Sequence, residues 1–134
     1  STPEIIRECE HNPNSRYMTD ACVEDFGVQN PAIYDCYPKF LRDSLRGTGD
    51  TLPNTVRRMT GATADRFMLK DRGYVKPGYF ADFTVFDEDE TKNATPDQTK
   101  SFGIKKVFIN GELVLDNDEL NKSARKSTGR ALTV

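Results

Sequence analysis

Apolar residues in the first part of the chain recur at helical spacing. Ile5, Ile6 and Cys9 fall on one face of a helix. The residues before them, Thr2-Pro3-Glu4, favour a helix start, with an N-cap hydroxyl, a proline in the first turn and an early acid. The pattern predicts a helix from Pro3 that stops at Asn12-Pro13-Asn14.

The same helical pattern returns further along the chain. Leu52, Val56 and Met59 follow one another at spacings of four and three. They predict a second helix, with Thr51 at its N-cap and Gly61 at its end.

Between these helices the pattern changes twice. Residues 15–19 are half apolar and predict a short strand, with Asp20 at its carboxyl end. Residues 21–38 lack periodicity and contain one glycine and two prolines, so we predict a long loop there, followed by a turn or two of helix over 39–45.

The second half of the chain is patterned as strands. Residues 83–86 alternate, and two apolar runs, 104–109 and 113–115, flank Asn110-Gly111, a dipeptide typical of a type I′ hairpin. Polar residues 91–103 predict a loop. The chain ends on Ala131-Leu-Thr-Val134, which predicts an edge strand, and the change from helical to strand patterning falls near Arg72-Gly73. We therefore expect an α/β organisation with two parts, 1–72 and 73–134.

Composition narrows the function classes. With 134 residues, 36% hydrophobic, 30% charged and a net charge of −2, the chain suits a globular protein and offers no electrostatic case for nucleic acid or anionic lipid. No apolar run is long enough to span a bilayer. Three cysteines are sparse for a stapled secreted domain, so we expect a reducing cytoplasm. The start at Ser1, without Met, suggests a processed or trimmed piece.

Metal-ligating and catalytic residue types are few. His11 is the single histidine, too few for a complete metal hydrolase or His triad. Cys9, Cys22 and Cys36 lack paired zinc spacings and are better interpreted as buried or loop thiols. Asp20 is either a turn-forming aspartate or an acid placed for chemistry at a strand end, and its local sequence leaves both open.

Two further patterns have simple structural interpretations. Gly47-Thr48-Gly49 and residues 70–73 predict turns, because neither has the context of a phosphate loop. Tyr34, Tyr37 and Phe40 recur at three-residue spacing, which favours packing over a substrate-pocket wall.

Several motifs together resemble a known superfamily. Val56-Arg-Arg-Met-Thr-Gly61, Asp71-Arg-Gly73, residues 76–87 and the Asn110-Gly111 hairpin resemble the C-terminal part of amidohydrolases. The segment 30–41, Asn-Pro-Ala-Ile-Tyr-Asp-Cys-Tyr-Pro-Lys-Phe-Leu, is similar to the His-Pro-Arg-x-Tyr-Gly-Thr-Phe-Pro-Arg-x-Leu segment of N-acyl-D-amino-acid deacylases (D-aminoacylases). The resemblance runs from about Pro3 to Leu132 and covers the last part of that family's sequence.

The resemblance implies a fold and a chemistry. The family has a metal-dependent TIM-like barrel and a small β-sandwich domain, so this chain would hold the last barrel strand–helix unit and part of the sandwich. The parent enzyme would use zinc or another divalent metal and hydrolyse the amide of N-acyl-D-amino acids. Asp20 matches the family's catalytic aspartate, which moves the proton of the attacking water and can touch the metal. Asn30 and Tyr34 would bind substrate.

Two departures qualify this expectation. Asn30 stands where the family pattern has histidine, and Ala21 stands where it has glycine. The family's His-x-His motif has no counterpart here and would lie upstream of Ser1. We therefore expect this chain alone to bind no metal and to be inactive, with the rest of the enzyme chain as its partner.

Three alternatives remain beside the deacylase. The parent could be a dihydroorotase- or hydantoinase-like enzyme that hydrolyses cyclic amides or imides. The chain could be a non-catalytic assembly module that forms a homo-oligomer through its sandwich strands. The third alternative is an inactive relative that keeps the fold, which the Asn30 departure motivates.

Overall fold

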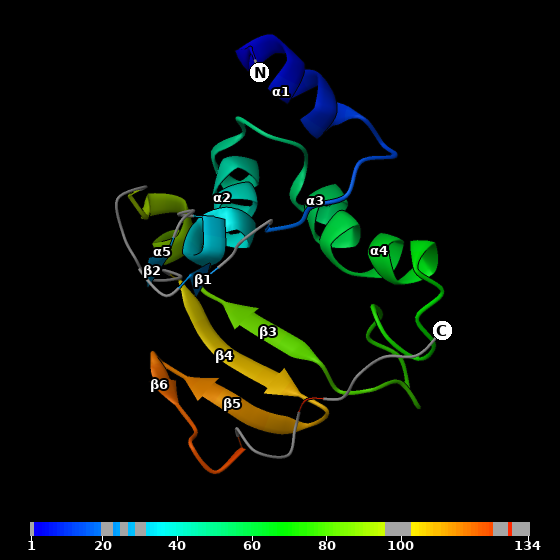
Figure 1. Cartoon of the computed structure of the whole chain (residues 1–134), viewed down its shortest axis with the longest axis vertical. Coiled ribbons are helices and arrows are strands. Elements are labelled where there is room, and N and C mark those ends of the chain that lie inside the picture. Colours follow the sequence, from blue (N-terminus) through cyan, green and yellow to red (C-terminus); the bar gives the residue numbers. More distant parts are fainter. Residues whose placement is uncertain are drawn as a thin grey trace.

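The structure is a computed structural model and describes residues 2–19, 23–24, 27–28, 32–95, 103–124 and 129. This part of the chain forms five helices and six strands. Figure 1 labels them along the ribbon. The helices are α1 (Pro3–His11), α2 (Ala32–Arg46), α3 (Leu52–Met59), α4 (Gly61–Arg66) and α5 (Glu88–Asn93). The strands are β1 (Val23–Glu24), β2 (Gly27–Val28), β3 (Phe83–Phe86), β4 (Ile104–Ile109), β5 (Glu112–Asp116) and β6 (Glu119–Leu120).

The two helices with predicted N-caps form where the sequence places them. Thr2 and Thr51 precede α1 and α3 in extended conformation, and each helix has proline in its first turn. The end of α3 differs from the prediction, because the backbone of Thr60 leaves helical geometry (φ −124, ψ −95). Gly61 consequently begins α4 instead of ending α3.

Helix α2 corrects the predicted loop over 21–38. It begins at Ala32 and continues through Pro38, which has no N–H to complete the helical ladder at that turn. Two charged side chains offset this loss, because Arg42 donates to both oxygens of Asp35 at 3.0 and 2.6 Å. The face that carries Cys36 and Leu41 is buried, so packing stabilises the helix across the proline.

The predicted strand over 15–19 is not observed. These residues are described without strand pairing, because no neighbouring strand lies beside them in the part of the chain that the structure describes. A single extended segment cannot form a sheet alone. Side chains from α2 and α3, and a backbone carbonyl of α4, hold this segment in place.

The main sheet follows the predicted strands closely. Its order is β3-β4-β5-β6, with every pair antiparallel. Asn110 (φ 51) and Gly111 (φ 86) both have positive φ, which confirms the hairpin turn between β4 and β5. A second tight turn at Asn117 (φ 45) and Asp118 (φ 71) leads to β6. The predicted edge strand over 131–134 lies outside the described residues.

Helix α5 corrects part of the predicted loop over 91–103. Asp87 caps the helix, because its carboxylate accepts the N–H of Glu90 at 2.9 Å. After the helix the chain returns at Gly103 (φ +82), which packs on Thr91 so closely that an added Cβ would lie 2.1 Å from its hydroxyl oxygen. Residues 96–102 lie outside the described part.

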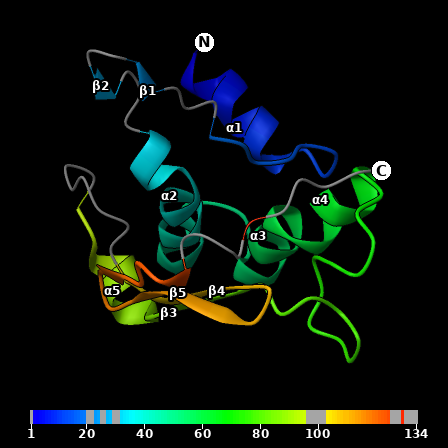
Figure 2. The ribbon, with the colours of Figure 1, turned by 60° about the horizontal axis from the view of Figure 1, so that its bottom comes forward.

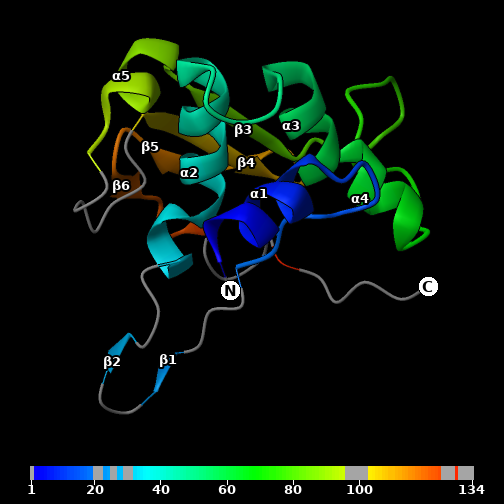
Figure 3. The same ribbon diagram turned by 90° about the horizontal axis from the view of Figure 1, so that it is seen from above.

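The helices gather on one side of the main sheet, as Figures 2 and 3 show from two directions. Helix α2 packs against α5, where Arg46 donates to the carbonyls of Lys92 at 2.6 Å and Ala94 at 2.8 Å. The buried apolar set within the described residues is small: Cys36, Leu41, Ala62, Ala64, Ala94 and Ala124. The expected α/β character is confirmed, and the main sheet is small and antiparallel. Within the described residues, none of the helices combines the length and apolar character needed to cross a membrane.

Candidate functional site

The segment that leads to Asp20 runs along helix α2. The Cys36 thiol donates to the carbonyl of Met18 at 3.0 Å, and the Tyr37 hydroxyl donates to the carbonyl of Tyr17 at 3.4 Å. Both donors come from the first half of α2. The helix therefore fixes the backbone of the residues immediately before Asp20.

Tyr17 anchors this segment through its ring. The Tyr17 ring stacks on the Phe40 ring, with their centroids 3.9 Å apart. The Arg58 guanidinium lies over the Tyr17 ring, 4.4 Å from its centroid. Burial raises the pKa of the Tyr17 phenol, although the nearby Arg58 cation opposes that rise. The phenol is consequently neutral at physiological pH and serves as a packing group.

Arg58 joins three parts of the chain. Its side chain is 4% exposed, its Nε donates to the carbonyl of Ser15 at 3.2 Å, and its Nη1 donates to the carbonyl of Glu10. The same Nη1 lies 3.5 Å from the Asp50 carboxylate. Nη2 is buried without a hydrogen-bond partner among the described residues. This one guanidinium ties the end of α1, the segment before Asp20 and the turn before α3.

The Asp50 carboxylate responds to this arrangement. Burial alone would raise its pKa, but the N–H of Thr51 at 2.7 Å, the amide of Asn54 at 3.3 Å and the Arg58 cation outweigh burial. The pKa of Asp50 is therefore lowered, and the carboxylate is charged at neutral pH.

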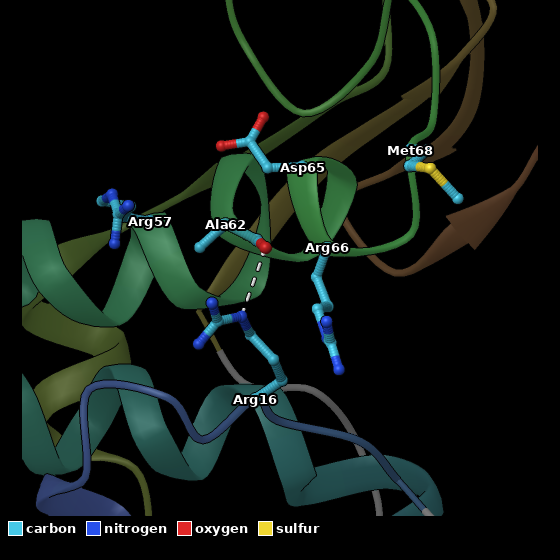
Figure 4. Close-up of a pocket in the computed structure, with 6 residues that line it drawn as sticks. All are labelled: Arg16, Arg57, Ala62, Asp65, Arg66 and Met68. Carbon is cyan, nitrogen blue, oxygen red and sulfur yellow. Dashed lines mark hydrogen bonds between the residues drawn. The ribbon is translucent and has the colours of Figure 1, made fainter.

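Arg16 fixes the segment to helix α4. Its Nε donates to the carbonyl of Ala62 at 3.2 Å, the dashed contact in Figure 4. Its Nη1 donates to the carbonyls of Pro13 at 3.0 Å and Ser15 at 2.8 Å. Residues 15–18 are thus held by contacts with α2, α3 and α4.

The structure describes one of the three predicted site residues. Tyr34 lies in the first turn of α2 and is 42% exposed. Asp20 and Asn30 lie outside the described residues. Their predicted roles in catalysis and substrate binding therefore stay predictions.

The described residues do not form a metal site by themselves. No group of three or more histidine, cysteine, aspartate or glutamate side chains gathers among them. Cys9 is exposed and Cys36 is buried, and burial raises the pKa of the Cys36 thiol. Cys22 lies outside the described part.

Sequence reasoning missed a polar clasp that joins the motifs of the second half. Arg72 donates through Nη1 to the Asp82 carboxylate and through Nη2 to Asn110 Oδ1 at 2.9 Å. Asp82 also accepts the N–H of Asn110 at 2.8 Å. The Arg72 guanidinium lies 4.1 Å from the ring centroid of Phe80. These residues therefore hold the hairpin turn in place. Each of them lies in a motif that carries the family resemblance, but no local spacing indicates that the motifs contact one another.

Comparison with known proteins shows which proteins this chain resembles. No family model matches it. It is 36% identical over 86 residues to the D-aminoacylase of Alcaligenes xylosoxydans xylosoxydans, an alignment that covers 61% of this chain and 18% of that protein. It is also 30% identical over 108 residues to the adenine deaminase of Oceanobacillus iheyensis, covering 80% of this chain and 16% of that protein.

Solved structures of deacylases share the fold of this chain. A D-aminoacylase mutant in complex with copper chloride superposes with a TM-score of 0.68 at 33% identity, covering 78% of this chain and 22% of that chain. The N-acyl-D-glutamate deacylase of Bordetella bronchiseptica, complexed with zinc and a phosphonate inhibitor, superposes with a TM-score of 0.69 at 30% identity, covering 83% and 24%.

The chain is therefore similar, in both sequence and fold, to D-aminoacylases and related deacylases. Its relatives in sequence include D-aminoacylase, N-acyl-D-aspartate deacylase and adenine deaminases, and its structural neighbours are D-aminoacylases and an N-acyl-D-glutamate deacylase. The chain spans only about a fifth of the length of the D-aminoacylases that it matches. The resemblance expected from the motifs is therefore confirmed for that part.

Proposed function

We propose that this chain is the C-terminal part of a metal-dependent amidohydrolase that hydrolyses N-acyl-D-amino acids to a carboxylate and a free D-amino acid. The single observation that carries the proposal is the similarity to D-aminoacylases and to an N-acyl-D-glutamate deacylase in both sequence and fold. The anchored segment before Asp20 supports it, because a catalytic acid has to be held in a fixed position.

In this proposal Asp20 is the proton-transfer residue. Its carboxylate takes a proton from the attacking water and returns a proton to the leaving amine. The same carboxylate is a possible metal ligand in the intact enzyme. Asn30 and Tyr34 bind the substrate, and Tyr34 presents a partly exposed phenol at the start of α2 for that purpose.

The metal ligands belong to the remainder of the enzyme in this proposal. Neighbouring structures were determined with copper or zinc, and the described residues here gather no ligand set of their own. Zinc or another divalent ion would supply Lewis-acid activation of water in the intact enzyme. The chain alone should therefore be inactive.

The proposed architecture assigns residues 1–72 to the end of a TIM-like barrel and residues 73–134 to part of a β-sandwich. The described elements support this division, since helices α1 to α4 lie before residue 67 and the main sheet begins at Phe83. Strand β3 pairs with β4 on one side only within the described residues. The sandwich strands of the remaining chain would pair with its other edge.

A reducing cytoplasm is the proposed location. The thiols of Cys9 and Cys36 are both free, and neither forms a disulfide among the described residues. Free thiols persist in a reducing compartment.

A substrate panel on the longest polypeptide encoded by the same gene tests the proposal. We expect zinc-dependent release of D-amino acid from N-acetyl-D-leucine or N-acetyl-D-glutamate, and none from the L-isomers. The 134-residue chain should release none. Turnover of adenine, dihydroorotate or a hydantoin in place of these amides would overturn the deacylase assignment.

One specific observation favours a second candidate. The alignment with the adenine deaminase covers more of this chain than the alignment with the D-aminoacylase, 80% against 61%. A parent enzyme that hydrolyses a C–N bond of a nitrogen heterocycle would fit that likeness. Ammonia release from adenine in the same panel, without release of D-amino acids, would support this candidate.

A separate structural observation supports a non-catalytic role in assembly. Phe83 and Val85 on β3 are 39% and 46% exposed, and the strand has a free edge among the described residues. We expect this chain to form a homo-oligomer through that edge, and Val85→Lys to shift it toward the monomer. Sedimentation velocity measures this, and a concentration-independent monomer of the unmodified chain would contradict the assembly role.

A further inference from the structure

An open pocket of about 470 Å³ lies between the segment before Asp20 and helices α3 and α4, as Figure 4 shows. Six residues line it: Arg16, Arg57, Ala62, Asp65, Arg66 and Met68. Three of the six are arginines and one is an acid. The whole chain carries a net charge of −2, so positive charge is concentrated at this place.

The Arg16 guanidinium is preorganised at this pocket. Three backbone carbonyls accept its Nε and Nη1 protons, at distances of 2.8 to 3.2 Å. These neutral partners hold the guanidinium in one orientation without cancelling its charge. In Figure 4 the side chains of Arg16 and Arg66 extend toward the same space from opposite walls.

The single acid of the pocket is already engaged. Asp65 accepts the hydroxyl proton of Tyr74 at 2.6 Å, and Figure 4 shows its carboxylate directed away from Arg16 and Arg66. The side chains of Arg57 and Arg66 are exposed, and neither is within salt-bridge distance of the Asp65 carboxylate, which accepts from Tyr74 instead. The guanidinium groups of Arg57 and Arg66 can therefore bind a ligand beside that of Arg16, which is held in one orientation.

We propose that the arginine pocket, formed by Arg16, Arg57 and Arg66, binds a small dianionic oxyanion. Guanidinium groups form forked, charge-assisted hydrogen bonds to the oxygens of phosphates and carboxylates. Three of them around one pocket match a ligand with two negative charges better than a single carboxylate. The proposal does not rest on the deacylase assignment, because none of the three arginines is a predicted catalytic or substrate-binding residue.

The test is an NMR titration of this chain with inorganic phosphate at pH 8, where phosphate is a dianion, in low-salt buffer. We expect saturable shifts of the arginine Nε–H resonances, with Arg16 among them because its Nε–H is protected by Ala62. Acetate should bind at least tenfold more weakly than phosphate. A parallel titration with succinate separates a preference for phosphate from a preference for dicarboxylates.

Charge-removing variants complete the test. The double variant Arg57→Gln/Arg66→Gln should weaken phosphate binding at least tenfold while the backbone amide spectrum stays folded, since both side chains are exposed. Arg7→Gln on α1 is the matched control and should leave binding unchanged. Shifts that do not saturate, or equal binding by the double variant and the control, would overturn the proposal.

Discussion

At the scale of single residues, a few charged groups hold the segment before Asp20. Arg58 is the centre of this arrangement, because it donates to two backbone carbonyls, faces Asp50 and lies against the Tyr17 ring. Buried charge is costly unless it is paired, so the arrangement depends on all of these partners. Two substitutions probe it.

Replacement of Arg58 by Met should lower the free energy of unfolding by about 3 kcal/mol, because the carbonyls of Glu10 and Ser15 lose their donor and Asp50 loses its neighbouring cation. Urea unfolding measures the change. Arg58→Lys should lower the free energy of unfolding by less, since lysine keeps the positive charge and loses only the forked donor geometry of the guanidinium. Arg7→Met on exposed α1 is the matched control, expected within about 0.5 kcal/mol of the unmodified chain. An Arg58→Met loss equal to that of the control would contradict the role given to Arg58.

The lowered pKa of Asp50 predicts a pH dependence. A carboxyl group whose pKa is lower in the folded state contributes stability above its ordinary pKa of 3.8, and that contribution is lost as the pH falls through the folded-state pKa. The difference in unfolding free energy between the unmodified chain and Asp50→Asn should therefore narrow from pH 6 to pH 3. Chemical denaturation at several pH values measures it, and a difference that stays constant or widens toward pH 3 would refute the assignment.

At the scale of elements, local signals predicted the ends and turns well. The structure confirms the N-cap positions of Thr2 and Thr51 and the Asn110-Gly111 turn, although neither threonine hydroxyl makes a capping hydrogen bond. The prediction failed at α2, because Pro38 was interpreted as a helix breaker although packing and the Asp35–Arg42 pair support the helix. Sequence pattern alone does not show such tertiary compensation.

The strand predicted over 15–19 failed for the opposite reason. Its local pattern is strand-like, yet strand formation depends on a neighbour, which the described residues do not supply. For the candidate site, the sequence predicted Asp20, Asn30 and Tyr34 but not the side chains that anchor the segment. Arg58 and Arg16 act through backbone carbonyls more than 40 residues away, and no local spacing signals such contacts.

The clasp of Arg72, Asp82 and Asn110 allows a test at this scale. Asp82→Ala should lower the free energy of unfolding by about 2 kcal/mol, because the Asn110 N–H and the Arg72 guanidinium both lose their acceptor. Asp116→Ala removes an ion pair with Lys106 whose side chains are 43% and 40% exposed, and should cost less than about 1 kcal/mol. Thermal unfolding compares the two variants, and equal losses would show that the clasp adds nothing beyond a surface pair.

At the scale of the whole molecule, much of the apolar surface is unburied. Large side chains on α1 and β3 stay exposed, among them Ile5 at 52% and Val85 at 46%. The chain also spans only about a fifth of the length of the D-aminoacylases that it matches. Both observations support the proposal that this chain packs against further polypeptide. The proposed function requires such a partner.

The central claim is that this chain supplies the proton-transfer residue of an N-acyl-D-amino-acid deacylase. The most direct measurement is the steady-state kinetics of Asp20→Asn in the longest polypeptide encoded by the same gene, with N-acetyl-D-leucine and zinc. The account predicts that kcat falls by about 10²- to 10⁴-fold while KM changes little. A kcat within tenfold of the unmodified enzyme would contradict it.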